Sequence, residues 1–241
     1  MDNNGLSRQE RRKKEREQEK LLRRNQGGRG SKTSQYVTWG IIGLTVAAVV
    51  AAIIFAGGPS KSSAVASVTD ADHIAGSRTA PAVLIEYSDF QCPACTAYYT
   101  VVKNLETKYG DKLAVVYRNY PLTQLHKNAQ LAAQAAEAAN LQGAFWPMHD
   151  LLFSRQDAWA NDASAQQIFT NYATELKLDV TKFGTDINSA AVKDRVAVDV
   201  ASGNAVGLTG TPTFFLNGTK LNNPGSEQGM IDLIDPVVAG K

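Results

Sequence analysis

An unbroken apolar run over residues 37–56 constrains this chain more than any other feature of its sequence. The run contains twenty residues and no charge. Twenty residues of α-helix, at about 1.5 Å each, span about 30 Å, which is the thickness of the hydrocarbon core of a bilayer. A helix without a polar face is a poor component of a soluble domain. The run therefore predicts one transmembrane helix over residues 36–56, with Tyr36 and Trp39 as interfacial aromatic residues.

Charge is divided unevenly between the two sides of this run. Residues 1–35 contain eleven Lys/Arg and five Asp/Glu, a net charge of +6. Residues 36–241 contain fourteen Lys/Arg and eighteen Asp/Glu, a net charge of −4. By the positive-inside rule, the basic tail over residues 1–35 is cytoplasmic, and the chain beyond the run is extracellular or periplasmic. We expect the tail to be a solvated segment that sets orientation, with a contact to anionic lipid or a partner as the alternative. The acidic remainder argues against nucleic-acid binding.

A cleaved signal peptide is the competing interpretation of the apolar run. Ala64-Val65-Ala66 resembles a processing site of the A-x-A type. The run is longer than an ordinary signal core, and this site lies about ten residues beyond its end, so an uncleaved anchor is favoured. Residues 57–69 then form a tether to an outer domain over residues 70–241.

The outer domain has the pattern of a mixed α/β fold. Glycine at 110 ends a predicted helix that begins at Pro93, and a terminal helix is expected near Glu227–Val238. Between the second and third strands, residues 122–207 hold only helical patterns, so we expect a helical domain inserted into a small α/β fold. Short apolar runs and a hairpin signal predict strands at Ala82–Tyr87, Leu113–Tyr117, Thr213–Leu216 and Thr219–Leu221.

Three features predict helices within the insertion. The segment Leu125–Asn140 is rich in alanine, the best helix former. A capping-box pattern predicts that another helix begins at Ser164. An i,i+4 row of Val192, Val196 and Val200 indicates the last helix of the group.

The two cysteines of the chain, Cys92 and Cys95, stand at the start of the helix that follows the first strand. This position is typical of thiol–disulfide exchange, since unpaired N–H groups at a helix N-terminus favour a thiolate. Cys92 is then the reactive sulfur, and Cys95, one turn further, is the resolving partner. A structural disulfide and a metal half-site are the alternatives, although His73, His126 and His149 show no zinc spacing with the pair.

Four segments together resemble the DsbA-like branch of the thioredoxin superfamily. They are EYSDFQCPAC at 86–95, NYPL at 119–122, QGAFWPMHDLLF at 142–153 and GTPTFF at 210–215. The resemblance covers residues 70–241 and implies a thioredoxin fold with an inserted helical domain. It also implies a cis peptide bond between Thr211 and Pro212, opposite the cysteines.

The resemblance places an acid, Glu86, beneath Cys95, where it would exchange a proton with that thiol. Glu86 lies within an apolar strand, and burial raises the pKa of a carboxyl group. An exposed glutamate at the end of the strand is the alternative. Asp89 is harder to explain, because a second carboxylate near Cys92 would oppose ionisation of the thiol.

Client recognition is expected around the cysteine pair. A cis-proline exposes the backbone of the preceding residue, so Thr211 would pair with an extended client chain as an added strand. Pro93, Ala94 and Phe90 are further candidates for client contact, although core packing is favoured for Phe90. Ala94 is neutral, whereas the best-known DsbA oxidases have histidine there, which argues against extreme oxidising power.

These observations together predict a membrane-anchored thiol–disulfide oxidoreductase. We expect a monomeric dithiol oxidase that acts on reduced or misoxidised exported proteins, with the Cys92–Cys95 disulfide as its redox group, no other cofactor and no metal. Two cysteines provide no internal relay, so a membrane partner must reoxidise the chain, and the resemblance suggests a quinone-linked oxidase. A reductase or isomerase fed by a membrane reductant is one alternative, and a tethered holdase without enzymatic activity is another. Client identity and the direction of electron flow are left open by the sequence.

Overall fold

The computed structural model describes residues 8–26 and 68–240, and these two parts are described separately. The predicted transmembrane helix over residues 36–56 lies outside the described residues, as do the Ala64–Ala66 site and nearly all of the tether. Within the two described parts, no helix is both long enough and apolar enough to cross a bilayer.

The basic tail contains one described helix, α1 (Arg8–Gln26). Glutamate and basic residues recur along it at a spacing of four, which supports an isolated helix through side-chain ion pairs. The side chains described in α1, those of residues 9 and 12–22, are all exposed. The helix therefore presents no apolar stripe over this stretch, as expected of a solvated segment.

A five-stranded sheet forms the centre of the second part, with strand order β1-β3-β2-β4-β5. The central pair, β2 and β3, is parallel, and every other pair is antiparallel. The strands β2 and β3 are buried along nearly their whole length, which explains their continuous apolar sequence. The strands are β1 (His73–Ala75), β2 (Ala82–Ser88), β3 (Leu113–Asn119), β4 (Thr213–Leu216) and β5 (Thr219–Lys220).

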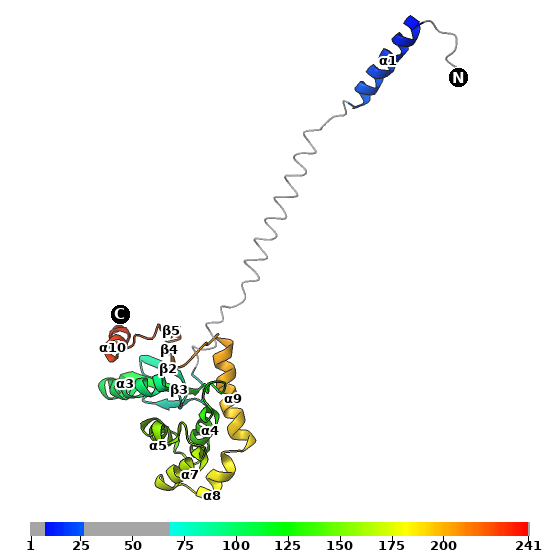
Figure 1. Ribbon diagram of the computed structural model, residues 1–241. Helices are drawn as coiled ribbons and strands as arrows, with labels where there is room; N and C mark the ends of the chain where they lie inside the picture. The colour runs from blue at the N-terminus through cyan, green and yellow to red at the C-terminus, as the bar shows by residue number, and fades with distance from the viewer. Residues whose placement is uncertain (1–7, 27–67, 241) are drawn as a thin grey trace. The chain divides into compact units, whose positions relative to one another are not determined.

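Helices cover both faces of this sheet (Figure 1). On one face, α3 (Pro93–Tyr109) and α10 (Glu227–Val238) pack over alternate residues of the strands, including Leu84 and Phe214. On the other face, Ile85 and Tyr87 pack with residues near the end of α9 (Ala190–Ala205). A short 3-10 helix, η2 (Gly110–Lys112), joins α3 to β3.

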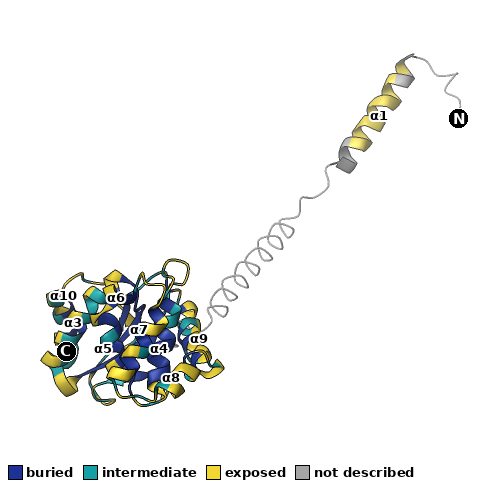
Figure 2. Ribbon diagram, turned by 60° about the horizontal axis from the view of Figure 1, so that its bottom comes forward, coloured by how far each residue is buried: buried dark blue, intermediate teal, exposed yellow. Residues whose placement is uncertain are grey.

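The segment between β3 and β4 consists of helices joined by turns and contains no strand, as predicted. Its central helix is α4 (Ala129–Asn140), whose alanines are all buried and allow neighbouring helices to approach closely (Figure 2). Phe169 and Trp159 of the surrounding helices belong to the same core cluster as both cysteines, so one continuous core joins the insertion to the sheet. The surrounding helices are α5 (Phe145–Ser154), α6 (Gln156–Trp159), α7 (Ala165–Glu175), α8 (Val180–Asp186) and α9.

Two local predictions need correction. The helix predicted from Leu125 begins instead at Ala129, because residues 122–128 form turns that hydrogen-bond to the loop before Cys92. The helix predicted at Ser164 does begin there, but its hydroxyl makes no capping bond. The short strand β1 was not predicted, since three residues are too few to show a period.

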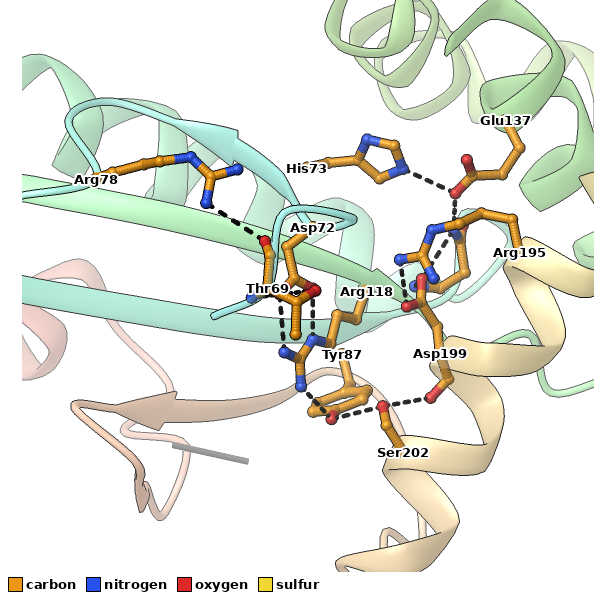
Figure 3. Close-up of polar contacts among 11 residues, drawn as sticks. Thr69, Asp72, His73, Arg78, Tyr87, Arg118, Glu137, Arg195, Asp199 and Ser202 are labelled. Carbon is orange, nitrogen blue, oxygen red and sulfur yellow. Dashed lines mark hydrogen bonds and ion pairs between the residues drawn. The ribbon is translucent and has the colours of Figure 1, made fainter. Parts of the chain in front are cut away.

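A buried polar network fastens the start of this part of the chain to the sheet and to α9 (Figure 3). The Asp72 carboxylate accepts two bonds from Arg118, at 2.8 and 3.0 Å, and Arg118 also donates to the Tyr87 hydroxyl at 2.8 Å. Tyr87 and Ser202 are 2.9 Å apart, and Ser202 donates to the carbonyl of Asp199 at 2.7 Å. The network links β3, β2 and α9 across the face of the sheet that α3 does not cover.

Candidate active site

The turn from β2 into α3 places Cys92 at the N-terminus of a helix. Cys92 is the N-cap residue of α3, and Pro93 occupies the first helical turn, where its missing N–H is not needed. No side chain caps this end, so its free N–H groups remain available to the Cys92 sulfur. Cys95 lies one turn further and is fully buried, whereas Cys92 is 8% exposed. Both thiols are free.

The surroundings of the pair separate the two thiols electrostatically. The pKa of Cys92 is lowered to about 5, and the largest cause is a hydrogen bond from the Cys95 thiol. Burial opposes this shift, while hydrogen bonds from the backbone of Cys95 and Ala94 and from Thr211 add to it. Burial and the neighbouring Cys92 sulfur raise the pKa of Cys95 well above its usual value. At neutral pH the reduced pair therefore holds one thiolate, on Cys92, and one thiol, on Cys95.

The loop before β4 faces Cys92. The Thr211–Pro212 peptide bond is cis, as the resemblance implies, and the Cys92 sulfur lies 3.6 Å from the carbonyl oxygen of Thr211. Pairing of β2 with β4 brings these segments together, since Tyr87 is opposite Thr213 in the register. Asn223 donates to the carbonyl of Pro212 at 2.6 Å, which holds the loop from its other side.

Glu86 lies in the middle of the sheet rather than exposed at a strand end. It is 3% exposed, and its Oε1 atom has no hydrogen-bond partner. Burial raises the pKa of Glu86 to about 7, helped by the charge of Glu106 and opposed by the Ser88 hydroxyl. A carboxyl group with this pKa can give or take a proton near neutral pH, as a general acid or base must.

Asp89 holds together the loop that leads into the cysteine pair. Its buried carboxylate accepts hydrogen bonds from the N–H groups of Gln91 (2.8 Å) and Leu122 (2.9 Å), and lies 2.7 Å from Nδ1 of His126. The bond from the N–H of Gln91, two residues further along the chain, forms an Asx turn. Aspartate favours this turn locally, so the sequence alone could have predicted it. The distant partners follow only from the tertiary structure.

Gln156 is a further residue of the site that sequence reasoning missed. This buried side chain of α6 donates to the carbonyls of Phe90 at 2.7 Å and Cys92 at 3.2 Å. The inserted domain thus holds the backbone of the reactive cysteine directly. A lone glutamine 64 residues away in the sequence gives no local signal of this contact.

The client-contact candidates lie in different environments. Pro93 and Ala94 are exposed beside Cys92, and Thr211 is partly exposed. Phe90 is 1% exposed, so the favoured interpretation of this residue as core packing holds and its candidate role in client contact does not. Its ring packs against Tyr117 and Phe153, with centroids 5.0 and 4.9 Å away, so it belongs to the core.

Comparisons with known proteins agree with this geometry. The thioredoxin family, in the group Thioredoxin_4, matches residues 68–236. The chain belongs to this family. Its fold resembles that of alpha-DsbA1 from Wolbachia pipientis (TM-score 0.64, 22% identity), covering 72% of this chain and 94% of that one. Oxidised BdbD from Bacillus subtilis is similar to the same degree (TM-score 0.64, 19% identity, 70% and 94% covered). The predicted DsbA-like thioredoxin fold is confirmed.

The curated relatives of this chain are much longer proteins. A Na+/H+ antiporter, NhaA 3 of Salinispora tropica, is 41% identical over 155 residues, which is 64% of this chain and 23% of that protein. The NhaA antiporter of Herminiimonas arsenicoxydans is 41% identical over 150 residues, with 62% and 23% covered. The chain therefore spans about a quarter of the length of these relatives.

Proposed function

We propose that this chain catalyses thiol–disulfide exchange through Cys92 and Cys95. The observation that supports this best is the separation of the two thiols, with an acidic Cys92 at a helix N-terminus and a protonated Cys95 buried behind it. The thiolate is the nucleophile in disulfide exchange, and the resolving thiol must remain protonated and unreactive until the mixed disulfide forms.

The proposed direction is oxidation of client dithiols. A client thiolate attacks the Cys92 sulfur of the disulfide form, the Cys92–Cys95 bond breaks, and a second client thiolate then releases Cys92. Stabilising the Cys92 thiolate stabilises the reduced chain, which makes its disulfide the stronger oxidant. This stabilisation arises from amide groups and Cys95 rather than from a cation, so the neutral Ala94 does not rule it out.

We further propose that the reaction takes place outside the cytoplasmic membrane, on exported proteins. Three observations support this: the uncharged run over residues 37–56, the basic residues before it, and the antiporter relatives, which are named for exchange of ions across a membrane. A membrane-bound, quinone-linked oxidase would then restore the disulfide, and the chain would act as a monomer. We propose no transport activity, since the match covers about a quarter of the antiporters.

Peptide oxidation tests the chemistry. The full chain, as a disulfide, is mixed with a reduced peptide that contains two cysteines, and formation of the peptide disulfide is followed by mass. Cys92→Ser should abolish oxidation, whereas Cys95→Ser should accumulate a mixed disulfide with the peptide. Alkylation of Cys92 in the reduced chain should be half-maximal near pH 5. Unchanged oxidation by the Cys92→Ser variant, or alkylation with a midpoint near 8.5, would contradict the proposal.

The reduction potential decides the direction. Equilibration with glutathione should give a value between about −120 and −180 mV if the chain is an oxidase. A value near about −270 mV would instead favour the reductase alternative.

A further inference from the structure

Ser88 and Glu86 lie on one face of β2, and Ser88 is nearer the end of the strand that leads to the cysteine pair. Side chains two residues apart on a strand point to the same face, so Glu86 and Ser88 both face α3, which contains Cys95. Tyr117 is paired with Glu86 across the parallel β2–β3 ladder and faces the same way. None of these four side chains is more than 3% exposed.

This cluster contains polar atoms without a partner. The Ser88 hydroxyl, Oε1 of Glu86 and the Tyr117 hydroxyl are each buried, and none makes a hydrogen bond. Leaving a buried hydroxyl unpaired costs about 1–3 kcal/mol. Alanine would avoid that cost, so the hydroxyl of Ser88 is better explained by a role in the reaction than by a role in stability.

The Ser88 hydroxyl is close enough to influence three groups. It lowers the pKa of Glu86, the pKa of Cys95 and the pKa of Tyr117 by stabilising the charged form of each. Glu86 lines a small cavity with Val102, Lys103 and Glu106 of α3, two to three turns of helix beyond Cys95. Ser88 lies at the end of β2 that leads into α3, on the same strand face as Glu86, and therefore lies on the path from the acid toward the resolving thiol.

We propose that the Ser88 hydroxyl relays the proton between the Glu86 carboxyl and the Cys95 thiol. This inference rests on the proposed function and names a residue of its resolving step. A hydroxyl group suits a relay because it accepts one proton while it donates another.

The relay balances in both directions. When a client thiolate attacks Cys92, the sulfur of Cys95 leaves with the electron pair of the broken bond and takes the Ser88 proton, while Ser88 takes one from Glu86. In reoxidation by an external disulfide, Cys92 first forms a mixed disulfide. Cys95 then gives its proton to Ser88, Ser88 gives one to Glu86, and the Cys95 thiolate attacks Cys92 as the second external thiolate departs.

A rival route avoids Ser88. A cavity of about 10 Å³, room for about one water molecule, is lined by Glu86, Tyr117, Lys103 and Glu106, among others. If a water molecule there served Cys95 directly, the serine would be dispensable. The Tyr117 hydroxyl lines this cavity, so removing it tests the water route while Ser88 is kept.

The relay is tested by the reaction of the reduced full chain with Ellman's reagent in detergent. This reaction has two stages, attack on the reagent and resolution of the mixed disulfide. The first coloured thiolate reports attack by Cys92, and the second reports resolution by Cys95. Ser88→Ala should leave the first rate unchanged within about twofold and slow the second by about tenfold or more. Ser88→Thr, which keeps the hydroxyl, should restore the second rate, and Tyr117→Phe should leave it near that of the unaltered chain.

The outcomes separate the relay from the proposed function. A Ser88→Ala variant that resolves as fast as the unaltered chain, or a Tyr117→Phe variant that is equally slow, would overturn the relay while exchange itself is intact. Failure of the unaltered chain to release the second thiolate would overturn the proposed function instead. A double-mutant cycle adds a second test: if the relay operates, Ser88→Ala should slow resolution no further once Glu86→Gln is present.

Discussion

At the scale of single residues, the site depends on titratable groups placed away from water. Burial is the leading cause of the raised pKa values of Cys95 and Glu86, whereas the pKa of Cys92 is lowered, which favours its charged form. Cys92 differs because the Cys95 thiol donates to its sulfur, and because amide groups at the helix N-terminus also point at it. Burial and a helix end, two ordinary features of a fold, thus assign opposite roles to neighbouring groups.

The buried Glu86 should make stability depend on pH. Its folded pKa of about 7 exceeds its ordinary value of 4.5, so its contribution to the unfolding free energy is fully present below pH 4.5 and is lost as the pH rises through 7. Relative to Glu86→Gln, the unaltered chain should lose roughly 3 kcal/mol between pH 4 and pH 8. Urea unfolding of both proteins at several pH values measures this, and parallel curves would show that Glu86 does not titrate in this range.

At the scale of elements, the loop before Cys92 and the turns before α4 are held together by buried hydrogen bonds. Asp89 bonds to residues 122 and 126, and Gln91 bonds to Asn128, so residues 122–128 are attached to the cysteine loop rather than to the alanine helix. This explains why α4 begins late. It also explains Asp89, whose carboxylate orders the loop that presents the reactive sulfur.

Replacement of Asp89 by asparagine should destabilise this part of the chain. The new amide group cannot accept from all three donors, which leaves at least one buried N–H unpaired at a cost of about 1–3 kcal/mol. Asp70→Asn is the matched control, because that carboxylate is exposed and should change stability by less than about 0.5 kcal/mol. Chemical unfolding measures both, and equal effects would mean that the contacts of Asp89 contribute little.

At the scale of the whole α/β part, residues 68–240, sheet and inserted helices are joined by both a core and a polar network. The core cluster that contains the cysteines extends through α4 to α7 and α8. On the other face of the sheet, the Asp72–Arg118 pair binds the segment before β1 to β3. The reactive cysteine is thus held by the sheet, by α3 and, through Gln156, by the insertion.

Removing the charge of Arg118 should weaken this assembly strongly. Arg118→Met leaves the Asp72 carboxylate buried without its cation, which is expected to cost about 3–5 kcal/mol. Arg78→Met, which removes a surface ion pair with Asp70, should cost less than about 1 kcal/mol. Thermal unfolding of the two variants measures the contrast, and a loss as small for Arg118 as for Arg78 would refute the anchoring role.

The sequence by itself determined the order of β2 to β5 around a helical insertion, the start of α3 at Pro93 and the family, because strand runs, caps and the C-x-x-C pair are local signals. Only the tertiary structure decided that Asp89 and Gln156 hold the cysteine loop, and that Ser88 and Glu86 share a fully covered face of β2 beneath α3. These contacts join residues far apart in the chain or depend on what covers a strand face. The periodicity of apolar residues in a sequence indicates which residues are buried, but not which groups they contact.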